Sequence, residues 1–274
     1  MDQEIKKLKQ IANKLRTNII KMISCAESGH PGGSLSATDI LTVLFFQKMK
    51  YDVKNPDWFD RDRFILSKGH CSPLLYSALA EAGFIKEEVL TKFRKINSCL
   101  QGHPARNYVP GIEMSTGSLG QGLSIANGVA LGLRLDKSKG HVYVLLGDGE
   151  LQEGMVWEAA MTAAHYEIDN LTAIVDQNGM QIDGLTKDVM NIEPLADKWK
   201  AFGWEVISID GHNFKAISDA LDKARTIKAK PTIILANTIK GKGVSFMEHS
   251  LKFHGSAPTL EQTELALREL EKNG

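Results

Sequence analysis

Residues 141–184 read HVYVLLGDGELQEGMVWEAAMTAAHYEIDNLTAIVDQNGMQIDG, and they contain the clearest structural pattern in the chain. Two short runs of apolar and β-branched residues, 141–146 and 171–176, predict buried strands. A helical pattern lies between them, over residues 153–166. A strand, a helix and a second strand in this order predict a βαβ unit, whose two strands are usually neighbours in a parallel sheet.

Polar oxygen ligands follow both predicted strands. Asp148 lies where the first strand ends, and Asn178 lies where the second ends. Together with a main-chain carbonyl from the Gly179-Met180 turn, they form a hard oxygen set that suits Mg²⁺ or Ca²⁺ and suits zinc poorly. Mg²⁺ is usually held by one or two protein ligands together with phosphate oxygens and water. The pattern therefore predicts a diphosphate ligand.

The glycines around Asp148 have two explanations. A Gly-Asp-Gly turn that joins a strand to a helix is the simpler reading of these three letters alone. Gly147 and Gly149 also let a phosphate approach the backbone closely, and the N-terminus of the following helix adds a favourable partial charge. With Asn178 after the next strand, the whole pattern favours a ligand site.

The rest of the chain continues the alternation of helices and strands. Helices are expected at 3–27, 37–48 with Ser36 as the N-cap, 73–81, 86–94, 118–135, 195–202 and 214–228, and further strands at 64–66, 204–209 and 231–238. This order predicts an α/β fold with a mostly parallel sheet and helices on both faces. Ligands in such folds bind outside the carboxyl ends of the strands.

The chain is expected to form a single domain over residues 1–274. It contains no internal repeat, low-complexity block or polar linker that would divide it. The last segment opens with the capping-box pattern Thr259 to Gln262 and runs as a charged helix to Asn273-Gly274, a natural helix stop. We therefore expect a genuine chain end rather than an element cut short.

Composition excludes several classes of protein. In 274 residues, 33 Lys and Arg balance 33 Asp and Glu, so the basic surface of a nucleic-acid binder is missing. No apolar run is long enough for a membrane span, and the charged start lacks the apolar core of a signal peptide. Cys25, Cys71 and Cys99 are too widely spaced for a disulfide framework or a zinc cluster. We expect a soluble cytoplasmic protein without nucleic-acid or membrane partners.

The sequence resembles the transketolases, a family of thiamine diphosphate enzymes. Gly-Asp-Gly at 147–149 followed by Asn178 is similar to the cofactor signature of that superfamily, and GDGELQEG at 147–154 resembles its transketolase form. Four further segments match in chain order: SGHPGGSLSATDIL from Ser28, LSKGHCSPLLY from Leu66, GHPARNYVPGIEMSTGSLGQG from Gly102, and TIKGKGVSFMEHSLKFHG from Thr238. The resemblance implies the diphosphate-binding module of the thiamine diphosphate fold.

The resemblance also implies residue roles. Asp148, Asn178 and the main-chain oxygen of Met180 would hold Mg²⁺, or Ca²⁺, on thiamine diphosphate. The implied cofactor-binding residues are His70, Gly117, Leu119, Gly149, Glu150, Ile182 and His254. The implied catalytic residues are His30, His70, His103, Glu153 and His254. Glu153 would face a subunit interface and contact the partner glutamate that activates the cofactor, although an acid in a first helical turn is also explained by the helix dipole.

Histidine suits the implied chemistry. Ketose cleavage removes a proton from a sugar hydroxyl and later returns it, and imidazole titrates near neutral pH. Four histidines this far apart in the chain need not share a site, but each lies next to a glycine in a predicted loop, where such folds collect functional groups. The remaining histidines are read as capped or exposed rings: His141, His165, His212 and His249.

Two departures from the family pattern stand out. Ser118 occupies the place of a proline in the turn before Gly120, a change that should leave the turn intact. Lys240 and Lys242 differ from the pattern as well, and could either steady a phosphate or simply be solvated.

Transketolases of full length also contain a pyrimidine-binding domain and a C-terminal domain, and both are absent from this sequence. The resemblance therefore implies a companion chain that carries them, an α₂β₂ assembly and sugar phosphate substrates, with transfer of a two-carbon ketol unit from a ketose phosphate to an aldose phosphate. The chain alone should be inactive. The alternatives are a subunit of a deoxyxylulose-phosphate synthase or of a 2-oxoacid dehydrogenase, and a non-catalytic scaffold or regulatory homologue. The sequence does not identify the sugar.

Overall fold

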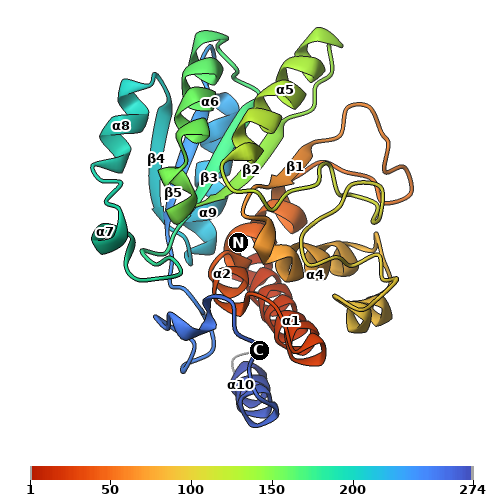
Figure 1. Cartoon of the computed structure of the whole chain (residues 1–274). Helices are drawn as coiled ribbons and strands as arrows, with labels where there is room; N and C mark the ends of the chain where they lie inside the picture. The colour runs from red at the N-terminus through yellow and green to blue at the C-terminus, as the bar shows by residue number, and fades with distance from the viewer. Residues whose placement is uncertain (1, 273–274) are drawn as a thin grey trace.

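The fold is built on one wholly parallel sheet, seen in a computed structural model that describes residues 2–272 (Figure 1). Its strands are β1 (Arg63–Leu66), β2 (Val142–Gly147), β3 (Leu171–Gln177), β4 (Glu205–Asp210) and β5 (Thr232–Asn237). They lie in the order β1-β2-β3-β5-β4, and every pair of neighbours is parallel. The predicted α/β class is confirmed, as is the pairing of β2 with β3.

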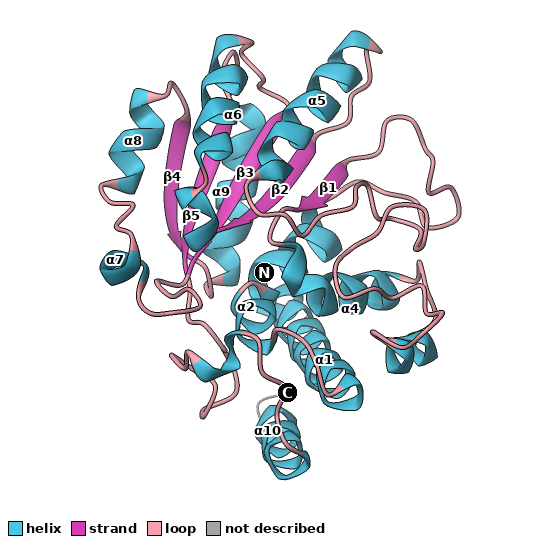
Figure 2. Cartoon of the chain, viewed as in Figure 1, coloured by secondary structure: helices cyan, strands magenta, loops and turns pink. Residues whose placement is uncertain are grey.

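Helices form a layer on each side of the sheet (Figure 2). One layer contains α1 (Asp2–Ala26), α2 (Pro31–Ser36), α3 (Thr38–Val43), α4 (Ser72–Ala82) and α9 (Phe214–Thr226), and α10 (Leu260–Lys272) packs against α1 away from the sheet. The other contains α5 (Gln121–Leu135), α6 (Gly154–His165) and α8 (Leu195–Ala201). The short helix α7 (Thr186–Val189) lies beyond the end of β3.

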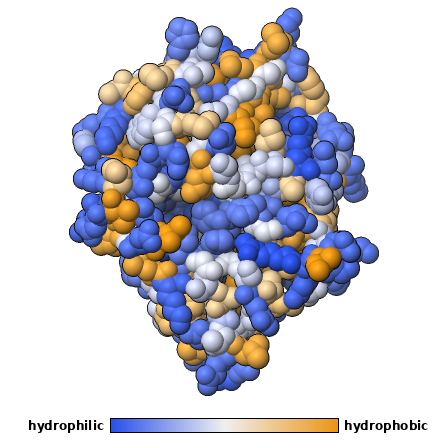
Figure 3. Space-filling model, viewed as in Figure 1, coloured by the Kyte–Doolittle hydropathy of each residue, from blue (hydrophilic) through white to orange (hydrophobic). Residues whose placement is uncertain are grey.

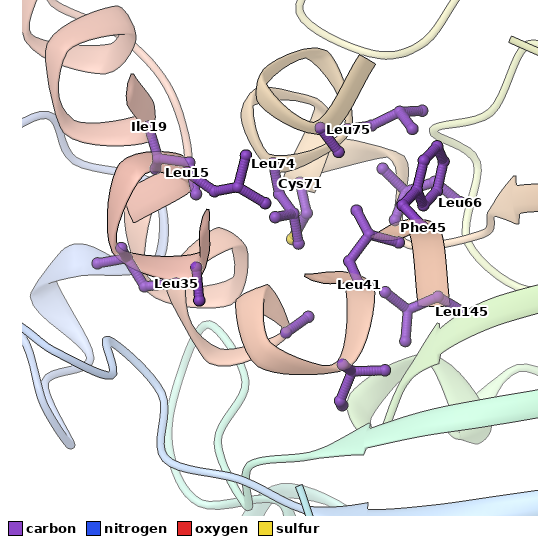
Figure 4. Packing of buried hydrophobic residues seen from close by; sticks show 14 of the residues in the cluster. Leu15, Ile19, Leu35, Leu41, Phe45, Leu66, Cys71, Leu74, Leu75 and Leu145 are labelled. Atoms are coloured by element: carbon purple, nitrogen blue, oxygen red, sulfur yellow. The ribbon is translucent and has the colours of Figure 1, made fainter. Parts of the chain in front are cut away.

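The alternation of side chains along the strands separates two hydrophobic cores. In β2, Tyr143 and Leu145 point into the core shared with α1, α3 and α4. Val144 and Leu146 point into the core shared with α5, α6 and α8. Figure 4 shows the first core, where Leu145 meets side chains from α3 and β1. A strand buried on both faces reads as a continuous apolar run, which is why this one is recognisable in the sequence.

The region before β1 departs from the prediction. Residues 31–36 form the helix α2, which the sequence pattern does not predict, and the helix predicted at 37–48 is α3 followed by the π-helical turn Leu44–Lys48. The prediction that Ser36 is an N-cap was wrong. Ser36 ends α2, and its hydroxyl donates a hydrogen bond to the Asp176 carboxylate. A buried carboxylate needs such donors more than a helix end does.

Three helix boundaries also differ from the prediction. The segment predicted as a helix at 86–94 is the 3₁₀-helix Glu87–Lys92. The helix predicted to begin at 118 begins at Gln121, and the one predicted to begin at 153 begins at Gly154, after the 3₁₀-helix Gly149–Gln152. The turns with positive φ at Gly117 and Gly120 take up the residues before α5.

The capping box before α10 is confirmed. The Thr259 hydroxyl accepts a hydrogen bond from the Gln262 amide at 3.2 Å, and the Gln262 side chain accepts one from the Thr259 amide at 3.1 Å. The expected helix stop at Asn273-Gly274 lies outside the described residues. Among the helices of residues 2–272, none is both long and apolar enough to cross a membrane.

His141 lies just before β2, at the amino-terminal ends of the strands and away from their carboxyl ends. Its side chain is buried, with 6% exposed. Its Nε2 lies 2.8 Å from the hydroxyl of Thr172. Burial, helped by the positive charge of Arg225, lowers the pKa of His141 to about 3. The folded chain therefore keeps this ring neutral where an unfolded chain would protonate it.

We predict that this histidine makes the protein less stable in acid. Below about pH 6.5 the unfolded state takes up a proton at this histidine and the folded state does not. The free energy of unfolding should therefore fall as the pH falls, by about 1.4 kcal/mol between about pH 8 and about pH 5.5. Urea unfolding at both values measures the loss. His141→Gln should reduce the difference by about this amount, and His165→Gln, at an exposed position, should not. An identical difference for the wild type and His141→Gln would contradict the prediction.

Candidate active site

A cavity of about 350 Å³ lies at the carboxyl ends of β1, β2 and β3. The residues predicted from the sequence line it, namely His30, His70, Gly117, Leu119, Asp148, Gly149, Glu150, Glu153, Asn178, Met180, Ile182 and His254. Only His103 of the predicted set is not part of the lining. In the space-filling view, hydrophilic residues gather across the middle of the molecule, at the level where the strands end (Figure 3).

One end of the cavity is an oxygen-rich pocket between β2 and β3. The register pairs Gly147 with Asp176, which places Asp148 beside the end of β3. The Asp148 carboxylate accepts a hydrogen bond from the Gly179 amide at 2.5 Å, so the two strand ends are tied together. The Asn178 side-chain oxygen accepts one from the Met180 amide at 3.1 Å.

This oxygen set suits a hard divalent cation. Burial, reinforced by the charge of Asp176, raises the pKa of Asp148 to about 6, so a bound cation would stabilise a carboxylate that burial disfavours. Within residues 2–272, no group of three or more His, Cys, Asp or Glu side chains could hold a metal by itself. A cation here would therefore rely on Asp148, the neutral oxygens of Asn178 and Met180, and oxygens brought by its ligand, as Mg²⁺ does.

A lysine from the TIKGKG segment enters the same pocket. Lys240 is 2% exposed, and its Nζ donates a hydrogen bond to the Met180 carbonyl at 3.2 Å and lies 2.8 Å from His254 Nδ1. Burial and the neighbouring charge of Lys68 lower the pKa of Lys240 to about 8. Lys242 instead pairs with Glu248 at 3.3 Å, away from the cavity. The structure thus separates two lysines that the sequence could not distinguish.

The wall behind this pocket is a buried network around Asp176. Its carboxylate accepts hydrogen bonds from Lys68, Ser36, Thr238 and the Asn178 side chain. Burial opposes its ionisation, but the charge of Lys68 holds the pKa of Asp176 below its ordinary value. Sequence reasoning missed both Lys68 and Asp176, although the first lies in the quoted LSKGH segment and the second ends a predicted strand.

Glu150 connects the two glycine turns that border the cavity. Its buried carboxylate accepts hydrogen bonds from the Gly120 amide at 2.9 Å and the Gly147 amide at 3.0 Å, and from the Ser67 hydroxyl. Gly120 has φ +86, and a Cβ there would lie 2.7 Å from the Cβ of Glu153. Only glycine fits this turn.

The four predicted histidines meet in one cluster. The ring centroid of His30 lies 5.2 Å from that of His70, 5.7 Å from that of His254 and 6.4 Å from that of His103. His70 and His254 stack with their centroids 5.5 Å apart. The spacing of these histidines in the sequence did not show whether they share a site, and the fold brings them together.

Burial keeps these imidazoles neutral. It lowers the pKa of His30 to about 4 and that of His254 to about 3, with nearby cations adding to the effect. The pKa values of His70 and His103 are lowered by the same cause. At physiological pH these rings are therefore unprotonated, which is the state in which a general base acts. The other four histidines, His141, His165, His212 and His249, lie outside the cavity.

The side of the cavity next to α6 and α7 is open. Glu153 is exposed, and its side chain makes no capping hydrogen bond to α6. Ile182 is 68% exposed, and Met155 and Leu185 are also exposed. An apolar rim around a polar cavity is typical of a surface that another protein covers.

A second cavity, of about 400 Å³, lies between α1, α10 and the 242–248 loop. Its buried charges are already paired: Arg16 with Asp39 at 2.8 Å, and Asp39 also with His212 at 2.8 Å. Glu269 accepts two hydrogen bonds from Ser245. We therefore place the candidate active site in the smaller cavity.

Comparison with known proteins agrees with this architecture. A family model described as the transketolase thiamine diphosphate binding domain matches residues 7–271. The 6-deoxy-6-sulfo-D-fructose transketolase subunit of a Clostridium species (strain MSTE9) is 46% identical over 97% of each chain. A subunit of the apulose-4-phosphate transketolase of Phocaeicola vulgatus is 42% identical over 98% of this chain and 95% of its own.

A solved structure shows the same fold. The transketolase of Campylobacter jejuni superposes with a TM-score of 0.91 at 37% identity over 96% of this chain. This chain spans only 42% of that transketolase, whereas it spans nearly all of the two relatives above. These matches favour neither a deoxyxylulose-phosphate synthase nor a 2-oxoacid dehydrogenase. The chain therefore belongs to the transketolase family, as an N-terminal, thiamine diphosphate-binding subunit.

Proposed function

We propose that residues 1–274 form the single diphosphate-binding domain of a two-chain cytoplasmic transketolase. The assembled enzyme would transfer a two-carbon ketol unit from a ketose phosphate to an aldose phosphate, with thiamine diphosphate and Mg²⁺. One observation carries the proposal: a single cavity is lined by a hard oxygen set and by the neutral imidazoles of His30, His70 and His254, with His103 beside His30. The first suits a metal-bound diphosphate, and the second suits proton transfer on a sugar.

The oxygen-rich end would hold the diphosphate. Asp148, Asn178 and the Met180 carbonyl would bind Mg²⁺, and the same ligands would accept Ca²⁺. When bound, thiamine diphosphate supplies the electron sink that carbon–carbon bond cleavage needs. Gly117, Leu119, Gly149, Glu150 and Ile182 would line or shape its place. Lys240 would turn its Nζ from the Met180 carbonyl to the phosphate oxygens, because a buried cation gains most from an anion.

The histidine cluster would handle the sugar. Lys240 Nζ lies 2.8 Å from His254 Nδ1, so a charged Lys240 donates to this nitrogen and leaves the ring proton on Nε2. His254 can then donate a hydrogen bond to a sugar or phosphate oxygen. His30 and His103, both neutral, would take a proton from a sugar hydroxyl and return it, with His70 packed against both His30 and His254.

A companion chain would complete the site. The exposed Glu153 and the apolar rim around Ile182 support a covering partner on that side. Two relatives of similar length are named as subunits of transketolases rather than as whole enzymes. We propose that the companion carries the pyrimidine-binding and C-terminal domains, that Glu153 contacts its activating glutamate, and that the assembly is α₂β₂. The names of the relatives specify different sugars, so we leave the sugar phosphate unassigned.

The proposed division of labour predicts that this chain has no ketol transferase activity by itself. Activity should appear on mixing with the companion chain, thiamine diphosphate and Mg²⁺, because only the companion can reach the cofactor ring. A coupled assay with a panel of ketose and aldose phosphates measures it. Full activity of the chain alone would refute the two-chain proposal, and a cofactor-loaded complex inactive on every pair would favour the scaffold.

The proposed metal site predicts that Asp148→Ala loses Mg²⁺-dependent binding of thiamine diphosphate. The loss should exceed about a hundredfold, since even outer partners of metal ligands contribute roughly 10–100-fold. Isothermal titration of the mixed subunits measures the affinity. Asp219→Ala, on the exposed face of α9, is the matched control and should bind normally. Equal affinity for wild type and Asp148→Ala would contradict the ligand assignment.

We predict different effects for substitutions of the two lysines in the 240–243 loop. Lys240→Met should weaken thiamine diphosphate binding by roughly 10-fold to 150-fold, because a hydrogen bond to a charged group contributes about 1.5–3 kcal/mol. Lys242→Met should change it little, since Lys242 pairs with Glu248 at the surface. The same titration compares the two variants. Equal effects of both substitutions would argue against a phosphate contact for Lys240.

A further inference from the structure

Arg94 adopts a backbone conformation that few non-glycine residues adopt. It follows the 3₁₀-helix Glu87–Lys92 and has φ +57. Its amide donates a hydrogen bond to the Leu100 carbonyl at 2.9 Å, which closes a tight loop. A long side chain in this region of φ is uncommon, and such positions often mark a functional constraint. The contacts of the Arg94 side chain indicate what this constraint is.

The Arg94 guanidinium bridges two loops that each carry a histidine of the cluster. Nη1 donates a hydrogen bond to the Ser28 hydroxyl at 2.7 Å, two residues before His30. Nη2 reaches the Gly102 carbonyl at 3.5 Å, one residue before His103. A Cβ on Gly102 would come within 2.9 Å of Arg94 Nε, so the guanidinium lies against the bare backbone of that loop. One side chain thus contacts both loops.

The charge of this arginine is not neutralised by an acid. Among residues 2–272, no carboxylate forms an ion pair with Arg94, and its buried Nε has no hydrogen-bond partner. The side chain is half-buried, where a charge acts over a longer distance than in water. The guanidinium carbon also lies 5.4 Å from the centroid of the Phe93 ring.

This unpaired cation acts on His30 and His103. Burial is the largest cause of the lowered pKa of each ring, and the charge of Arg94 is the next cause for both. The other titratable groups that face His30 are His103, Lys240, His70 and His254, and all of them are bases. Among residues 2–272, the charged groups that act on His30 include no carboxylate, so no acid offsets the effect of Arg94 on its protonation.

We propose that Arg94 is a positioning residue that fixes the distance between His30 and His103 and keeps both imidazoles unprotonated. The positioning role follows from the contacts of Arg94, and its effect on catalysis rests on the proposed ketol transfer. A neutral pair of rings at a fixed spacing can exchange a proton with a sugar hydroxyl, and an imidazolium cannot accept one. Arg94 itself need not touch the sugar.

Histidine titration tests the proposal without any activity. In the isolated chain labelled at histidine, NMR follows His30 and His103 in the wild type, Arg94→Gln and Arg94→Lys. Arg94→Gln should raise both pKa values by at least about half a unit, because a cation is removed. Arg94→Lys should stay close to the wild type, since it keeps the charge. Arg134→Gln, on the exposed end of α5, is the matched control and should leave both values unchanged.

Kinetics of the assembled enzyme separate positioning from substrate binding. Arg94→Gln should lower kcat and move the acid limb of kcat/KM to higher pH. Arg94→Lys should restore the pH profile but not the full kcat, because an ammonium cannot bridge Ser28 and Gly102 as the planar fork does. Unchanged histidine pKa values in Arg94→Gln would overturn the proposal. So would a raised KM with kcat and pH profile unchanged, which would make Arg94 a contact for the substrate phosphate.

Discussion

A single buried carboxylate, Asp176, connects the parts of the cavity. It lies one residue before the end of β3, and its oxygens accept hydrogen bonds from Lys68 after β1, Ser36 at the end of α2, and Thr238 after β5. The Asn178 side chain contacts it as well. Because a buried ion pair with one member removed typically costs about 3–5 kcal/mol, this network constrains every element that reaches it. The ends of three strands and one helix are thereby held in register around the oxygen-rich pocket.

The charges of this pocket complement a metal-bound diphosphate. The pKa of Lys240 is lowered to about 8, because its buried positive charge is not fully compensated by nearby anions. The pKa of Asp148 is raised to about 6, because its buried negative charge is not fully compensated by nearby cations. A diphosphate relieves the first, and a divalent cation relieves the second. Either one alone would leave the other group uncompensated. The electrostatics of the pocket thus favour the two ligands together.

The other end of the cavity depends on burial. The packing that brings His30, His70, His103 and His254 together also removes water from them, so their common state is neutral. On the side of Glu153 and Ile182 that packing stops. Exposed residues on that side of the site leave room for a second chain to pack there.

The parallel α/β fold, the βαβ unit and the meeting of Asp148 with Asn178 could all be predicted from the amino-acid sequence. Strands buried on both faces, and polar residues directly after them, are local signals. Tertiary structure alone decided that the four histidines share a cluster, that Lys240 rather than Lys242 enters the cavity, and that Ser36 binds Asp176 instead of capping a helix. It also revealed Lys68 and Arg94. Burial, ion pairing and pKa depend on which distant segments pack together, and spacing along the chain does not encode that packing directly.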